Sequence, residues 1–133
     1  KAGDILDLDS KISINVIDAY NTDTGSSTRK QHKKGKGVGY ILTIGSLVVY
    51  HAGDTDFISS MKELKNIDIA FVPIGGKFTM NIEEAIRATL VINPRIVIPI
   101  HHLGQNPGIF CLKLSKKSKI NCIVPEIGQI IKL

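Results

Sequence analysis

The stretch "LVVYHAGDTDF", residues 47–57, joins an apolar run directly to a group of polar side chains. Residues 47–50 have the composition of a buried strand, and His51 and Asp54 follow at once. Gly-Asp is common turn chemistry, but α/β proteins also place metal ligands and catalytic groups where buried strands end. The stretch therefore predicts either a plain turn or one part of a site whose other parts lie at the ends of other strands.

The length and composition predict one globular domain over residues 1–133. The chain is long enough for one hydrophobic core, 43% of its residues are hydrophobic, and only 5% are aromatic. Strands filled by branched aliphatic side chains are the expected result. No apolar run reaches the roughly 18 residues of a membrane span, and the N-terminus lacks a signal-peptide layout. We therefore expect a cytoplasmic protein without a membrane partner, in which Cys111 and Cys122 are free, buried cysteines.

The net charge of +5 comes from one short segment. The segment "RKQHKKGKG", residues 29–37, contains five Lys and Arg residues and no acid, and the other 12 basic residues of the chain equal its 12 acidic ones. A neutral protein with one basic loop is not a typical nucleic-acid binder, so we expect no nucleic-acid partner.

Hydrophobic periodicity predicts a mixed α/β fold. Strands are expected at 11–20, at 67–74 and 95–102, in a hairpin over 38–51 that turns at 44–46, and in two short pieces around 126–128. Helices are expected at 56–66, 79–93 and 106–118, the second of them capped by Thr79 or Asn81. Strands that alternate with helices belong to the α/β or mixed class.

Three of the expected strands end in polar chemistry. Asn21 follows the first, Asp54 follows the hairpin, and His101 and His102 end the strand at 95–102. Imidazole nitrogens and carboxylate oxygens are the ligands that zinc takes in proteins. Each residue alone also fits a turn or a half-exposed position, so the pattern leaves a metal site and ordinary loop ends as alternatives.

The stretches "YHAGDTDF", "IDIAFVPIGGKFTMNIEEA" and "INPRIVIPIHH" together resemble the C-terminal half of metal-dependent hydrolases of the metallo-β-lactamase superfamily. They are most similar to the predicted zinc-dependent hydrolases related to the ascorbate-phosphate lactonases. The resemblance implies an αββα sandwich with its metal site at one edge between two sheets. This chain would supply a half or partial sandwich, a mixed sheet with flanking helices.

The resemblance also implies roles for single residues. Asp54 would bind metal and act in catalysis, and His101 would be the last histidine ligand. Zinc, or another divalent metal, would provide metal-bound hydroxide for attack on an ester, lactone or phosphoester. Asn21 stands where the family often has a ligand histidine, which makes it only a possible ligand.

The family's HxHxDH motif is absent from this chain, whose histidines number four. We therefore expect the chain to be inactive alone, with no metal of its own, and to pair with a missing N-terminal half or with itself. The rival hypothesis is a non-catalytic remnant or binding module whose basic loop binds an anionic partner.

The remaining marked residues receive supporting roles. His51 is expected to orient a ligand or to pack, and His102 to face away from His101 if the strand continues. Lys33, Lys34 and Lys36 are candidate anion-binding residues that would attract a small anionic substrate. The alternative for these lysines is a disordered surface loop.

Overall fold

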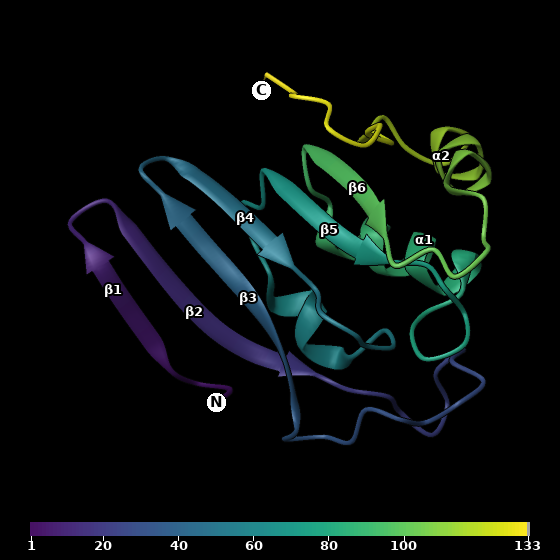
Figure 1. The fold of residues 1–133 in the computed structure, drawn as a ribbon, viewed down its shortest axis with the longest axis horizontal. Coiled ribbons are helices and arrows are strands. Elements are labelled where there is room, and N and C mark those ends of the chain that lie inside the picture. The colour runs from purple at the N-terminus through teal and green to yellow at the C-terminus, as the bar shows by residue number, and fades with distance from the viewer. Residues whose placement is uncertain (133) are drawn as a thin grey trace.

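The computed structural model describes residues 1–132, which form one mixed sheet with helices on one side (Figure 1). The seven strands lie side by side in chain order. The first four pair antiparallel and the last four pair parallel, so β4 belongs to both parts. The strands are β1 (Ile5–Asp9), β2 (Ile12–Ala19), β3 (Gly37–Ile44), β4 (Leu47–His51), β5 (Ile69–Pro73), β6 (Ile96–Ile100) and β7 (Asn121–Cys122).

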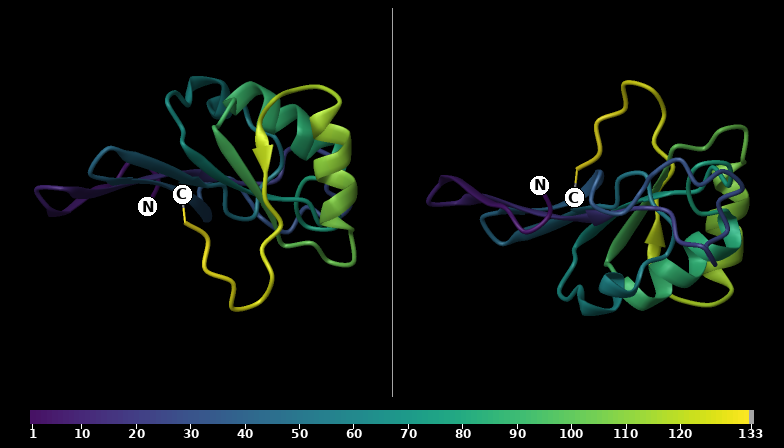
Figure 2. Two further views of the ribbon diagram at one scale, coloured as in Figure 1. Left: turned by 90° about the horizontal axis from the view of Figure 1, so that it is seen from above. Right: turned by 90° about the horizontal axis from the view of Figure 1, so that it is seen from below.

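The helical elements cover one face of the sheet. The 3-10 helix η1 (Ser59–Glu63) and the helices α1 (Ile82–Ile92) and α2 (Pro107–Ser115) lie on the same side in the edge-on views, and the C-terminal segment passes to the other side (Figure 2). Within residues 1–132, no helix combines the length and apolar character needed to cross a membrane.

Local sequence explains the helix ends. The Asn81 side chain accepts a hydrogen bond from the Glu84 N–H, so Asn81 and not Thr79 caps α1. The helix ends at Asn93, whose left-handed backbone is tolerated by asparagine. Lys113 of α2 pairs with Glu83 in the first turn of α1, and this bond lowers the pKa of the Glu83 carboxyl. The two helices are therefore joined at the surface as well as through the core.

The main core lies between the sheet and the helices. Tyr50 of β4 and Phe110 of α2 are among its largest fully buried side chains. The Tyr50 hydroxyl has no hydrogen-bond partner within the described chain, and burial raises the pKa of Tyr50 above its usual range. Alternating residues of β4, β5 and β6 point into this core: Val48, Tyr50, Ala70, Val72 and Val97.

The opposite face of the sheet is also apolar and is only partly covered. A second cluster joins buried side chains of β5 and β6 to partly buried neighbours: Ile69, Ile96, Ile98, Leu47, Val49, Phe71, Ile100 and Ile123. Ile123 belongs to the C-terminal segment that passes over this side (Figure 2). Farther along the same face, Leu6 and Ile44 remain 48% and 46% exposed. The cover therefore ends before β3, β2 and β1.

Most of the predicted elements are confirmed, and three expectations are wrong. Strand β1 was not anticipated, because its exposed sequence "ILDLD" carries two acids. Of the two last strands expected around 126–128, the described chain has only β7, at 121–122, and residues 127–128 form a turn. Cys111 and Cys122 are not free: they form a disulfide between α2 and β7, with Cα atoms 5.5 Å apart. Their separation of 11 residues gave no indication of this pairing, because the turn that brings them together had no recognisable motif.

Candidate metal centre

The candidate site lies at the edge where the parallel strands end. Asp54 follows β4 after Gly53, which has φ +66° and approaches the Val38 carbonyl so closely that a Cβ atom would lie 2.4 Å from that oxygen. His101 follows β6 directly and has φ 51°. A glycine is thus required where the chain turns toward Asp54, and both candidate ligands sit on short turns held by the sheet.

The structure brings Asp54 and His101 together. His101 Nδ1 lies 3.0 Å from Asp54 Oδ1. This nitrogen is buried and yet makes no hydrogen bond with acceptable geometry, so the short distance reflects proximity without an aligned bond. A buried imidazole nitrogen without a partner, facing a carboxylate, fits a pair of donors that share a cation. The expected metal-binding role of Asp54 and His101 stays a prediction, and their geometry is compatible with it.

His32, which the sequence analysis did not select, reaches the same carboxylate. His32 Nε2 lies 3.4 Å from Asp54 Oδ2, the oxygen that His101 does not approach. All three side chains are partly accessible, with exposed fractions of 26% for His32, 45% for Asp54 and 31% for His101. The only signal in the sequence was a histidine inside a long polar loop, and such a loop has no periodicity to show its direction.

Asn21 holds His32 in place. The Asn21 Oδ1 atom accepts a hydrogen bond from the His32 N–H, and the Asn21 N–H donates to the His32 carbonyl at 2.7 Å. The Asn21 amide nitrogen donates to the Phe78 carbonyl at 2.8 Å. Both polar atoms of the side chain are thus used by backbone groups. The structure therefore gives Asn21 the role of an anchor for the loop and does not show it as a ligand.

Asp56 organises the first half of the same loop. Its side chain is fully buried and accepts hydrogen bonds from the Thr22 N–H, from the N–H and hydroxyl of Ser27, and from Lys30 Nζ. Gly25 passes so close to this carboxylate that a Cβ atom would lie 2.1 Å from Oδ2. Residues 20–32 are therefore wrapped around a buried charge, and the alternative of a disordered loop is not what the structure shows.

The middle of the loop between β2 and β3 is joined to the segment after β5. Thr28 N–H donates to the Gly76 carbonyl, and Arg29 N–H donates to the Lys77 carbonyl at 2.7 Å. Figure 1 shows the segment between β2 and β3 running along the edge where the parallel strands end. Together with the Asn21 and Asp56 contacts, these bonds fix the loop at three separate places beside Asp54.

His51 and His102 lie outside this group. His51 Nδ1 accepts a hydrogen bond from Gly53 N–H, and its ring stacks on Phe71, so it packs and supports the turn. His102 Nε2 lies 2.9 Å from the Pro99 carbonyl oxygen. We expected His102 to face away from His101 if the strand continued, but β6 ends at Ile100. The directions of the two side chains are therefore set by the turn and not by strand alternation.

The donors present fit a divalent metal in kind and not in arrangement. Among residues 1–132, no group of three or more His, Cys, Asp or Glu side chains is placed so that it could hold a metal ion. The two imidazoles instead contact different oxygens of one carboxylate. Two nitrogens and a carboxylate are a common zinc donor set, so the residues match the chemistry of such an ion while the arrangement is that of an incomplete shell.

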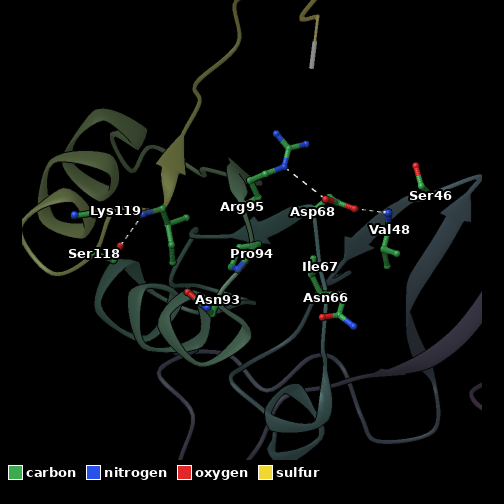
Figure 3. A pocket seen from close by; sticks show the side chains of 11 residues that line it. Ser46, Val48, Asn66, Ile67, Asp68, Asn93, Pro94, Arg95, Ser118 and Lys119 are labelled. Atoms are coloured by element: carbon green, nitrogen blue, oxygen red, sulfur yellow. Dashed lines mark hydrogen bonds and ion pairs between the residues drawn. The ribbon is translucent and has the colours of Figure 1, made fainter.

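A cavity of about 690 Å³ lies at the opposite ends of the parallel strands. It is lined by residues that precede these strands, including Ser46, Asp68 and Arg95. Figure 3 shows Asp68 between Arg95 and the Val48 N–H. Strand direction separates this cavity from Asp54 and His101, which follow the strands. The chemistry of the side chains, and not this cavity, therefore identifies the candidate site.

Comparison with known proteins agrees with the fold and with the family. Residues 3–101 match the family described as the Beta-lactamase superfamily domain. A metal-dependent hydrolase of Methanosarcina mazei is 32% identical over 130 residues, which cover 92% of this chain and 56% of that relative.

Two solved structures show the same architecture. A protein of Parabacteroides distasonis superposes with a TM-score of 0.84 at 38% identity, over 93% of this chain and 55% of its own. The metallo-beta-lactamase fold protein YhfI of Bacillus subtilis, at 13% identity, supports the fold alone, with a TM-score of 0.75 over 99% of this chain and 54% of its own. The chain spans about half the length of these relatives. With a mixed sheet, helices on one face and a family match over most of its length, this chain belongs to the beta-lactamase superfamily.

Proposed function

We propose that this chain is the C-terminal portion of a metal-dependent hydrolase, in which Asp54 and His101 hold the metal. The observation that carries the proposal is the buried His101 Nδ1, which has no hydrogen bond and lies 3.0 Å from Asp54 Oδ1. His32, 3.4 Å from the other oxygen, is the third donor that we add. The relatives support the class of reaction, since they include a metal-dependent hydrolase.

Zinc is the metal that suits two imidazoles and a carboxylate best, and such an ion supplies an acidified water for attack on an ester, lactone or phosphoester. The residues of this chain have the task of holding it. Asp54 carries the negative charge, His101 presents Nδ1 from the end of β6, and Asn21 fixes the backbone of His32. Asp56 keeps the loop that carries His32 closed against the sheet.

The remaining ligands and a partner surface would come from outside this chain. The chain spans about half the length of its relatives, and the sheet face opposite the helices leaves Leu6, Tyr40 and Ile44 exposed between β3 and β1, although Val16 of β2 is buried. Exposed apolar patches of this kind are typical of buried interfaces. We therefore propose that a second sheet packs on this face, supplied by the half that the relatives possess in addition or by a second copy of the chain.

The metal proposal is tested by measuring zinc affinity, in competition with a chelator, in a protein that joins this chain to the N-terminal half that its relatives possess. Asp54→Ala and His101→Ala should each weaken binding at least about tenfold, because each removes a donor atom. His32→Ala should also weaken it. His102→Ala is the matched control, because the His102 ring nitrogen lies 2.9 Å from the Pro99 carbonyl oxygen, and this variant should bind zinc like the unmodified protein.

The pattern of losses decides the assignment. Equal loss on His101→Ala and His102→Ala would contradict it, as would zinc binding that persists after Asp54→Ala. Hydrolysis of carboxylic and phosphate esters by the same variants then tests the reaction class separately from the metal.

A further inference from the structure

The loop between β2 and β3 carries positive charges that the fold does not use. Lys33, Lys34 and Lys36 are exposed, and none of them forms an ion pair within residues 1–132. Lys30 differs, because it pairs with the buried Asp56 at 3.2 Å. Within one short segment, one lysine therefore stabilises the loop and three are available to a ligand.

These lysines are held beside the candidate metal centre. His32, which reaches Asp54, is the direct neighbour of Lys33 in the chain. Lys34 Nζ lies 5.4 Å from the centre of the Tyr20 ring, within the range of a cation–π contact. Tyr20 in turn precedes Asn21, the anchor of His32. The ammonium group of Lys34 is thus placed against a fixed element next to the site.

The loop is ordered enough to present these charges as a surface. Its first half wraps around Asp56, and its middle is bonded to the segment after β5. That segment adds Lys77, whose Nζ lies 5.2 Å from the Phe78 ring and whose carbonyl accepts the Arg29 N–H. A second segment that carries a lysine is therefore bonded to the middle of the loop. A solubilising role alone would not need these anchors.

We propose that Lys33 and Lys34 bind the anionic group of a small substrate, a carboxylate or a phosphate, while its reactive bond lies at Asp54, His32 and His101. This inference rests on the proposed function for the identity of the reactive centre. The anion contact itself requires no metal, because a fixed ammonium group attracts an anion by charge alone. On this proposal the loop selects the substrate, and the metal ligands Asp54, His32 and His101 do not.

The test uses metal-free protein, so that the anion site is measured without the reactive centre. Inorganic phosphate and malonate are titrated separately at low salt by calorimetry or by NMR shifts. Replacing Lys33 and Lys34 together by Gln should weaken binding of the preferred anion at least about fivefold, the factor expected from one charge contact in water. Raising sodium chloride to about 0.5 M should weaken it in the unmodified protein as well. The anion that binds more tightly identifies the group.

A matched control removes the same charge elsewhere. Lys116 and Lys117 are exposed at the end of α2, and their double replacement by Gln should leave anion binding within about twofold. Equal weakening by both pairs would overturn the proposal in favour of a general effect of net charge. Absence of anion binding in the unmodified protein would also overturn it. So would tight binding of a duplex oligonucleotide without binding of either small anion. Zinc binding that persists in the Asp54→Ala and His101→Ala variants, measured separately, would overturn the metal proposal and leave this result intact.

Discussion

The replacement Asp56→Asn tests how strongly one buried carboxylate determines the site. Asp56 has no exposed side-chain surface, and its two oxygens accept four hydrogen bonds from three residues of the loop. Asparagine has nearly the same shape but replaces one acceptor oxygen with a donor. The Oδ2 position, which three donors face, would keep the amide oxygen. The NH2 group would then face the Ser27 N–H. Both groups are hydrogen-bond donors, so neither would find an acceptor in the other.

The cost can be estimated from these contacts. Hydrogen bonds to a charged group contribute about 1.5–3 kcal/mol and neutral ones about 0.5–1.5 kcal/mol. An unsatisfied buried donor costs a further 1–3 kcal/mol or so. The share of Lys30 is discounted, because its side chain is 39% exposed and solvent weakens its pairing. We expect Asp56→Asn to lower the free energy of unfolding by about 3 kcal/mol, a large part of the roughly 5–15 kcal/mol typical of a domain.

Urea unfolding and amide hydrogen exchange measure this effect in the purified protein. The unfolding midpoint should fall, and the amides of residues 22–32 should lose protection first, because they form the loop around Asp56. Zinc affinity should fall too, although Asp56 touches no ligand, since His32 depends on this loop. Asp23→Asn, at an exposed position of the same loop, is the control and should change stability by less than about 0.5 kcal/mol. An unchanged midpoint together with unchanged protection of residues 22–32 would refute the reasoning.

Two further predictions concern the edges of the sheet. Replacing Cys111 and Cys122 by Ser should lower the free energy of unfolding by about 3 kcal/mol, by the loop-entropy relation for a separation of 11 residues. The unmodified protein should react with a thiol reagent only after reduction, and two reactive thiols before reduction would contradict the disulfide. The apolar face from β3 to β1 should cause self-association or binding of a second chain, so Leu6→Lys together with Ile44→Lys should reduce the sedimentation coefficient toward that of a monomer. Replacing exposed Lys62 and Lys65 by Ala is the control, and a compact monomer in the unmodified protein without a partner would refute this idea.

The predictable part of the fold is the part in which one face of an element is buried. Strands β2 to β6 and helix α1 show clear hydrophobic patterns, and each was predicted close to its observed position. A helical segment over 56–66 was expected from the spacing of Phe57, Ile58, Met61 and Leu64, of which all but Phe57 are buried, and the structure has the shorter 3-10 helix there. Strand β1 was missed because its five residues are all exposed, and an exposed strand is not required to alternate. The disulfide was missed because no local rule relates its two cysteines.

The same distinction between patterned strands and polar loops applies to the residues of the candidate site. Asp54 and His101 were selected because each follows a buried apolar strand, Asp54 after two residues and His101 directly, and the ends of parallel strands meet at one edge. His32 was not selected, because ten loop residues separate it from Asn21 and the path of a polar loop is set by tertiary contacts. Those contacts include Asp56, which the sequence presented as one more acid after a Gly-Asp turn. Its burial is visible only once the loop is folded around it.

Asn21 anchors a loop at a position where the resemblance implies a histidine, and His32 of that loop brings an imidazole to the same edge of the sheet. The family resemblance led us to expect a histidine at the end of β2, and this chain has Asn21 there. Asparagine supplies both a donor and an acceptor at short reach, and here these atoms bind the Phe78 carbonyl and the His32 N–H. A histidine also has one donor and one acceptor nitrogen, but they lie on opposite sides of a larger ring, so we expect it not to make both backbone contacts. The strand end therefore anchors the loop, and the loop brings an imidazole to Asp54. On this reading Asn21→His should not add a ligand. It should instead release His32 and weaken zinc binding, because an imidazole ring cannot replace both hydrogen bonds that hold the loop.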